Sequence, residues 1–110
     1  MLRAMPDSLD DLTRRVDAFA AARDWHRFHS PKNLASALIV EAGELLEHFQ
    51  WLTEAQSQSL DDAQKVEVAD EMADVLLYLV QMANVMKVDL IAAAQRKVER
   101  NETRFPPLST

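Results

Sequence analysis

Apolar residues recur along this chain every three or four positions, which is the spacing of one face of an α-helix. The pattern predicts a first helix from residue 8 to about 24, a second over 31–51, a third from 61 or 62 to 85 or 86, and a fourth from 89 to just before 106. The polar stretch 53–60 is expected to be a loop. The sequence therefore predicts an all-α protein, a helical bundle of about four helices per chain.

The expected helix starts carry side chains that can cap the first turn. Ser8 is followed by acidic residues, Ser30 precedes Pro31, and Asp89 precedes the last helix. Serine and aspartate oxygens accept hydrogen bonds from the free N–H groups of a first turn, and proline at the first helical position loses no needed donor. These signals support the first, second and fourth of the predicted helices.

The second and third helices each carry an apolar stripe that we expect to face the core. At 100° per residue, the stripes contain Leu34, Leu38, Ala42, Leu45, Phe49 and Leu52 in one helix, and Val68, Met72, Val75, Leu79, Met82 and Met86 in the other. A shift of 30 residues superimposes EAGELLEHF on EMADVLLYL, which aligns Glu41 with Glu71 and Glu44 with Asp74. The two helices therefore form a weak internal repeat with acids at the edge of each stripe.

Composition limits the class of protein. The 110 residues, 12.5 kDa, suit one domain over 1–110, and a single glycine with four prolines argues against an all-β fold. There is no cysteine to form a disulfide or a thiolate metal site. Residues 1–12 lack the apolar run of a signal peptide, and the longest run, 75–80, is far shorter than the roughly 20 residues that span a bilayer. We expect a cytoplasmic protein with no membrane partner.

Charge is segregated along the chain. The net charge is −6, but residues 41–74 hold ten carboxylates and one base, for −9, and the rest sums to +3. An isoelectric point near 4.9 argues against a nucleic-acid partner, because such binding depends on lysine and arginine. The segregation points to a site that uses negative charge in the middle of the chain.

A bound divalent cation would offset the negative charge of such a site. If the two central helices pack as neighbours, their four edge acids meet, and like charges repel by about 4 kcal/mol per pair at 4 Å in an effective dielectric of 20. Oxygen ligands suit Mg²⁺, Mn²⁺ or Ca²⁺, and Mg²⁺ in particular combines carboxylates with substrate phosphates. A di-iron bundle would need Glu-x-x-His, which the chain lacks. A single Glu-x-x-Glu is also common on solvated helix faces.

The acids match a known pattern. Glu41, Glu44, Glu71 and Asp74 resemble the ExxE and ExxD pair of the MazG-like nucleoside triphosphate pyrophosphohydrolases. The block RDWHRFHSPKNLASALIVEAGELLEHFQW, residues 23–51, is similar to the dCTP pyrophosphatase group within that superfamily. Near the end, Lys97, Asn101, Arg104, Phe105 and Pro106 resemble the group's KxxxNxxRYP, with phenylalanine replacing tyrosine.

The resemblance implies an activity. It implies that a deoxynucleoside triphosphate, dCTP or a modified dCTP, is hydrolysed to the monophosphate and pyrophosphate, which sanitises the nucleotide pool. The four acids would be the catalytic residues and would hold Mg²⁺, with Mn²⁺ as a possible substitute. It also implies a homo-oligomer, either a homotetramer built as a dimer of dimers or a homodimer, which completes the helical bundle.

The resemblance also implies substrate-binding residues. A base pocket would include Trp25, His29, Trp51 and Tyr78, and phosphate contacts would come from Lys97, Asn101 and Arg104. The aromatic residues could instead pack in the core, and the bases could simply complement the helix dipole. The alternative function is a noncatalytic helical oligomer with a structural metal or a solvated acidic face. His48 has no assigned role.

Overall fold

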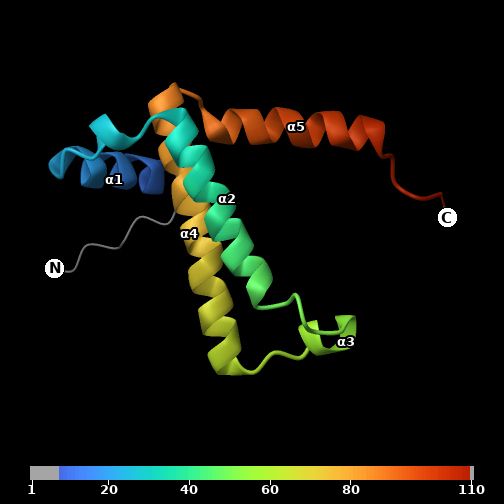
Figure 1. The fold of residues 1–110 in the computed structure, drawn as a ribbon. Helices are drawn as coiled ribbons and strands as arrows, with labels where there is room; N and C mark the ends of the chain where they lie inside the picture. The colour runs from blue at the N-terminus through green and yellow to red at the C-terminus, as the bar shows by residue number, and fades with distance from the viewer. Residues whose placement is uncertain (1–7, 110) are drawn as a thin grey trace, which may run out of the picture.

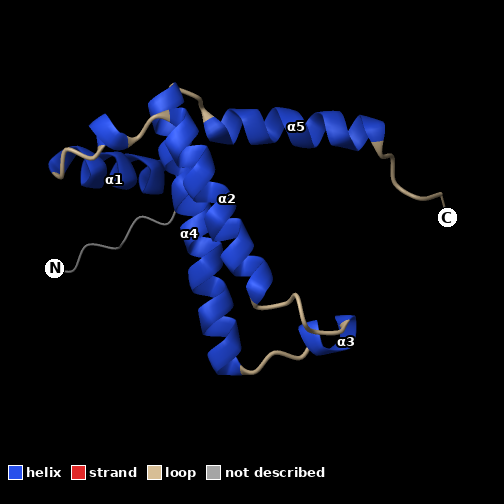
Figure 2. Cartoon of the chain, in the orientation of Figure 1, coloured by secondary structure: helices blue, strands red, loops and turns tan. Residues whose placement is uncertain are grey.

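The computed structural model describes residues 8–109, and every regular element within that range is helical (Figures 1 and 2). The elements are α1 (Leu9–Ala22), a 3₁₀ helix (His26–Phe28), α2 (Pro31–Glu47), α3 (Glu54–Ser57), α4 (Asp62–Met86) and α5 (Leu90–Arg104). The all-α prediction is confirmed. Residues 1–7, most of the segment in which we expect no signal peptide, lie outside the described residues.

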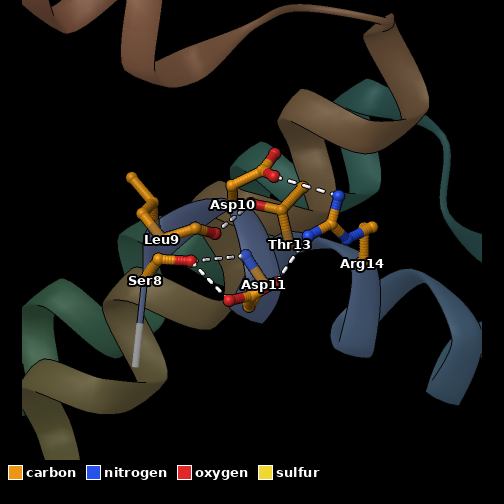
Figure 3. A network of polar contacts seen from close by, with 6 residues as sticks. All are labelled: Ser8, Leu9, Asp10, Asp11, Thr13 and Arg14. Carbon is orange, nitrogen blue, oxygen red and sulfur yellow. Dashed lines mark hydrogen bonds and ion pairs between the residues drawn. The ribbon is translucent and has the colours of Figure 1, made fainter. Parts of the chain in front are cut away.

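The predicted caps are present at the helix starts. The Ser8 hydroxyl accepts a hydrogen bond from the Asp11 N–H at 3.0 Å, and Arg14 pairs with Asp10 at 3.0 Å one turn later (Figure 3). The caps of α2, α4 and α5 are Ser30, Asp61 and Asp89. Each of these side chains accepts a hydrogen bond from an otherwise free N–H, which is why short-range sequence signals predict the helix starts correctly.

Two predictions for the segment between the central helices are wrong: the end of the second helix and the loop that follows it. Helix α2 ends at Glu47 and not near residue 51, because the chain tightens into i→i+3 hydrogen bonds such as Phe49 N–H to the Leu46 carbonyl at 2.8 Å. The stretch expected to be a loop contains the one-turn helix α3. Thr53 and Gln56 form a reciprocal capping box there, which stabilises a turn too short to show periodicity.

Helices α2 and α4 run antiparallel side by side, and α1 crosses one end of α4 (Figure 1). The best-buried large side chains are Leu34, 2% exposed, and Val80, 0% exposed. The stripe predicted for α4 is partly wrong, since Met72, Leu79 and Met86 are 57%, 37% and 50% exposed. Because 75–80 is apolar all round the helix, periodicity alone could not single out the buried face.

Helix α5 extends away from the α2–α4 pair (Figure 1). Lys87, with a left-handed φ of 58°, ends α4, and the chain bends by 106° before α5. The Cα radius of gyration is 17.4 Å, against about 13 Å for a compact chain of this length. No single helix within 8–109 is long and apolar enough to cross a membrane; α4 and α5 meet the length and composition criteria only when taken together across the bend.

Leu34→Ala is expected to lower the free energy of unfolding by about 3 kcal/mol, because it removes buried methyl groups and leaves a cavity. Urea unfolding followed by circular dichroism measures the change. Leu108→Ala is the matched control, since Leu108 is exposed and its truncation should change stability by less than about 0.5 kcal/mol. Equal losses in the two variants would contradict this account of the core.

Candidate active site

Three carboxylates meet where α2 faces α4, and we call Glu41, Glu44 and Glu71 the acidic cluster. One carboxylate oxygen from each residue lies within 4.8 Å of the other two. All three side chains are half-buried. The antiparallel packing of the two helices has thus brought together acids that are 30 residues apart, as the internal repeat predicts.

The environment of the acidic cluster disfavours its negative charge. Burial raises the pKa of Glu41 and of Glu71, and the carboxylates of Glu44 and Asp74 raise both further. The Oε2 atoms of Glu41 and Glu71 are buried and have no hydrogen-bond partner within residues 8–109. Carboxylate oxygens that face one another without donors fit a divalent cation, which would satisfy them and offset their repulsion.

Two further groups adjoin the acidic cluster. Asp74, one turn beyond Glu71 on α4, is exposed but close enough to influence both raised pKa values. The Nε2 of His48, which follows the end of α2, lies 3.8 Å from an oxygen of Glu71. The structure therefore gives His48 a place beside the acids, which sequence reasoning had not assigned.

A cavity of about 390 Å³ lies between α1 and α4 and adjoins the acidic cluster through Asp74. Three residues predicted to belong to the site line it: Trp25, Asp74 and Tyr78. The rest of the wall comes from Leu12, Arg15, Val16, Phe19, Leu77 and Gln81. Its size is that of a small-molecule site, and its wall is apolar with a few polar groups.

Aromatic packing holds Trp25 in the cavity wall. Its ring meets Phe19 edge-on at 5.3 Å between centroids, and the Arg23 guanidinium covers the Phe19 ring at 3.6 Å. The His29 ring is 6.2 Å from that of Trp25 but does not line the cavity. Burial, with a contribution from His26, lowers the pKa of His29, which favours its neutral imidazole.

The remaining predicted residues lie outside the cavity within one chain. Trp51 is 86% exposed and follows α2, whose C-terminal end is far from α1 (Figure 1). Lys97, Asn101 and Arg104 are exposed on α5, which extends away from the α2–α4 pair (Figure 1). A single chain thus brings the acids, Trp25 and Tyr78 together, with His29 next to Trp25. Trp51 and the three α5 residues do not line the cavity.

Sequence reasoning missed part of the cavity wall. Val16 and Phe19 follow the helical spacing of apolar residues in α1, and the crossing of α1 over α4 makes them part of the cavity wall. Gln81 was overlooked, although it interrupts an apolar stretch of α4 three residues after Tyr78. A lone polar residue on an apolar helix face was the available signal.

Comparisons with known proteins identify the relatives of this chain. The chain is 42% identical over 101 residues to human dCTP pyrophosphatase 1 and 43% identical to the mouse protein, matches that cover 90% of this chain. It spans 59% of the length of these relatives. A crystal structure of a pyrophosphatase from Archaeoglobus fulgidus superimposes with a TM-score of 0.83 at 34% identity, covering 97% of this chain and all of that one. Residues 37–107 match the MazG-like family, and the chain belongs to that family.

Proposed function

We propose that residues 1–110 form one domain that hydrolyses a deoxynucleoside triphosphate to its monophosphate and pyrophosphate, with dCTP or a modified dCTP favoured. The observation that carries the proposal is the junction at Asp74, where the acidic cluster adjoins a cavity of small-molecule size. The names of the relatives, dCTP pyrophosphatase 1, support the substrate. Removing noncanonical nucleotides from the pool is the role that suits this reaction.

The acidic and the aromatic residues of the site would have different roles in this reaction. Glu41, Glu44, Glu71 and Asp74 would hold Mg²⁺, or Mn²⁺ in its place, because their donor set is all oxygen. When bound, the ion supplies charge neutralisation on the phosphates and lowers the pKa of water. Trp25 and Tyr78 offer aromatic faces on which a base can stack. The substrate would then lie with its phosphates toward Asp74 and its base inside the cavity.

A second copy of the chain would complete the site. The accessible surface is 9068 Å², against about 6,200 Å² for a compact monomer of this mass. Large apolar side chains such as Ile39, Leu46 and Val66 are exposed on the helices. Association into a homodimer or a homotetramer would bury them, and would allow Trp51 and the α5 residues Lys97, Asn101 and Arg104 to reach a neighbour's substrate.

The purified protein is expected to release pyrophosphate from dCTP with Mg²⁺, more slowly with other canonical triphosphates, and not at all in excess chelator. A panel of canonical and modified nucleotides, assayed for pyrophosphate with and without EDTA, measures this. Equal rates on every nucleotide would remove the dCTP preference but not the reaction class. Calorimetry that shows no Mg²⁺-dependent binding of a nonhydrolysable dCTP analogue would instead favour the noncatalytic oligomer.

A further inference from the structure

Gln81 places a side-chain amide in the wall of the cavity. Asp74, Tyr78 and Gln81 occupy positions i, i+4 and i+7 of α4, so they share one face of the helix, and all three line the cavity. The rise of the helix separates Gln81 from Asp74 by roughly 10 Å. Gln81 therefore marks the part of the cavity that is farthest along α4 from the acidic cluster.

The side-chain amide of Gln81 has an unpaired oxygen within residues 8–109. Its Oε1 atom is buried, and it has no hydrogen-bond partner in the described part of the chain. The neighbouring wall residues Leu12, Val16 and Leu77 are apolar and offer it none. An unpaired buried carbonyl oxygen is rare and destabilising in folded proteins. Because the Gln81 side chain lines the cavity, a rotation of the amide would bring this oxygen to a ligand, which would then be the missing partner.

We propose that Gln81 binds the base of the substrate, hydrogen-bonding the edge of the pyrimidine that carries position 4. This inference rests on the proposed function, which orients the phosphates toward Asp74 and the base toward Gln81. Cytosine presents its 4-amino donor beside the N3 acceptor, and a carboxamide presents an acceptor beside a donor, so the two can pair through two hydrogen bonds. If the amide rotates by 180°, it can also pair with a 4-keto pyrimidine. Gln81 therefore favours a pyrimidine with either an amino or a keto group at position 4.

The test compares dCTP with its pyrimidin-2-one analogue, which lacks the 4-amino group. Wild-type protein should favour dCTP by about tenfold in kcat/KM, the effect of one good hydrogen bond. Gln81→Met keeps the length of the side chain and removes its polar atoms, so it should remove the tenfold preference for dCTP, mainly through KM; the analogue, which keeps only the hydrogen bond at N3, should lose about tenfold less than dCTP. Gln58→Met is the control, because Gln58 is exposed beyond α3 and should change neither substrate.

Thermal unfolding separates this role from a structural one. Because the buried Oε1 atom has no hydrogen-bond partner among residues 8–109, Gln81→Met should keep or raise the Tm without ligand. A nonhydrolysable dCTP analogue should raise the Tm of wild-type protein more than that of the variant. A lower Tm together with equal losses on both substrates would overturn the inference.

Failure of the proposed function would look different. If wild-type protein releases no pyrophosphate from any triphosphate, the proposed activity is wrong, and the thermal shift with the nonhydrolysable analogues still decides the role of Gln81. If dCTP is hydrolysed but the ratio of dCTP to pyrimidin-2-one turnover is the same in wild-type protein and Gln81→Met, the activity stands and the inference about Gln81 is overturned.

Discussion

Glu41→Gln should lower the rate of pyrophosphate release from dCTP by more than about a hundredfold, beyond the 10–100-fold typical of residues that only support a metal ligand. The substitution keeps the shape of the side chain but replaces an anionic oxygen of the acidic cluster by an amide. A cation bound there would lose charge compensation and one ligand. Steady-state pyrophosphate assays at saturating Mg²⁺ measure the loss.

The same substitution should stabilise the metal-free protein. Since the folded state raises the pKa of Glu41 above its ordinary 4.5, the folded protein binds more protons than the unfolded chain, and stability falls as pH rises through that interval. At neutral pH the negative charge of the cluster therefore destabilises the folded protein, and Glu41→Gln removes part of that charge. Melting in EDTA should show a Tm higher by a few degrees at neutral pH, and little difference below about pH 4.5, where Glu41 is protonated.

Glu47→Gln is the matched control, because Glu47 ends the same helix, is exposed and lies outside the acidic cluster. It should leave both the rate and the metal-free Tm close to wild type. A Glu41→Gln protein that keeps its activity would show that the cluster is not catalytic. One that loses activity and stability together would point to a structural role for Glu41.

Mixing two inactive variants should restore activity. Arg104→Ala removes a proposed phosphate contact on α5, and Glu71→Gln disables the acidic cluster. If α5 of one chain serves the cluster of another, coexpression in equal amounts should give about a quarter of wild-type activity, because half of the clusters are intact and half of those receive an intact α5. Pyrophosphate release by the purified mixed oligomer, compared with each variant alone, measures this.

Glu41→Gln mixed with Glu71→Gln is the control for that experiment. Both residues belong to a cluster that α2 and α4 of a single chain build, so no mixture of these two variants contains an intact cluster. Recovery in this control would contradict the assignment of the cluster to one chain. Absence of recovery in both mixtures would show that Arg104 does not act across subunits.

Local features of the sequence were enough to predict the helix starts and the meeting of the acids. Ser8, Ser30 and Asp89 act within one turn, and the repeat of Glu41 at Glu71 needs only that consecutive helices pack as neighbours. The cavity and the direction of α5 depend on longer-range geometry. They follow from how α1 crosses α4 and from the left-handed backbone of Lys87, neither of which leaves a periodic signal.

The helices that hold the acidic cluster are neighbours in the sequence, joined by residues 48–61. Closing so short a connection costs little chain entropy, so this antiparallel pair can form early in folding. The like charges of the cluster then oppose the first long-range contact that the chain makes. Divalent cations in solution should therefore speed the folding of the single chain.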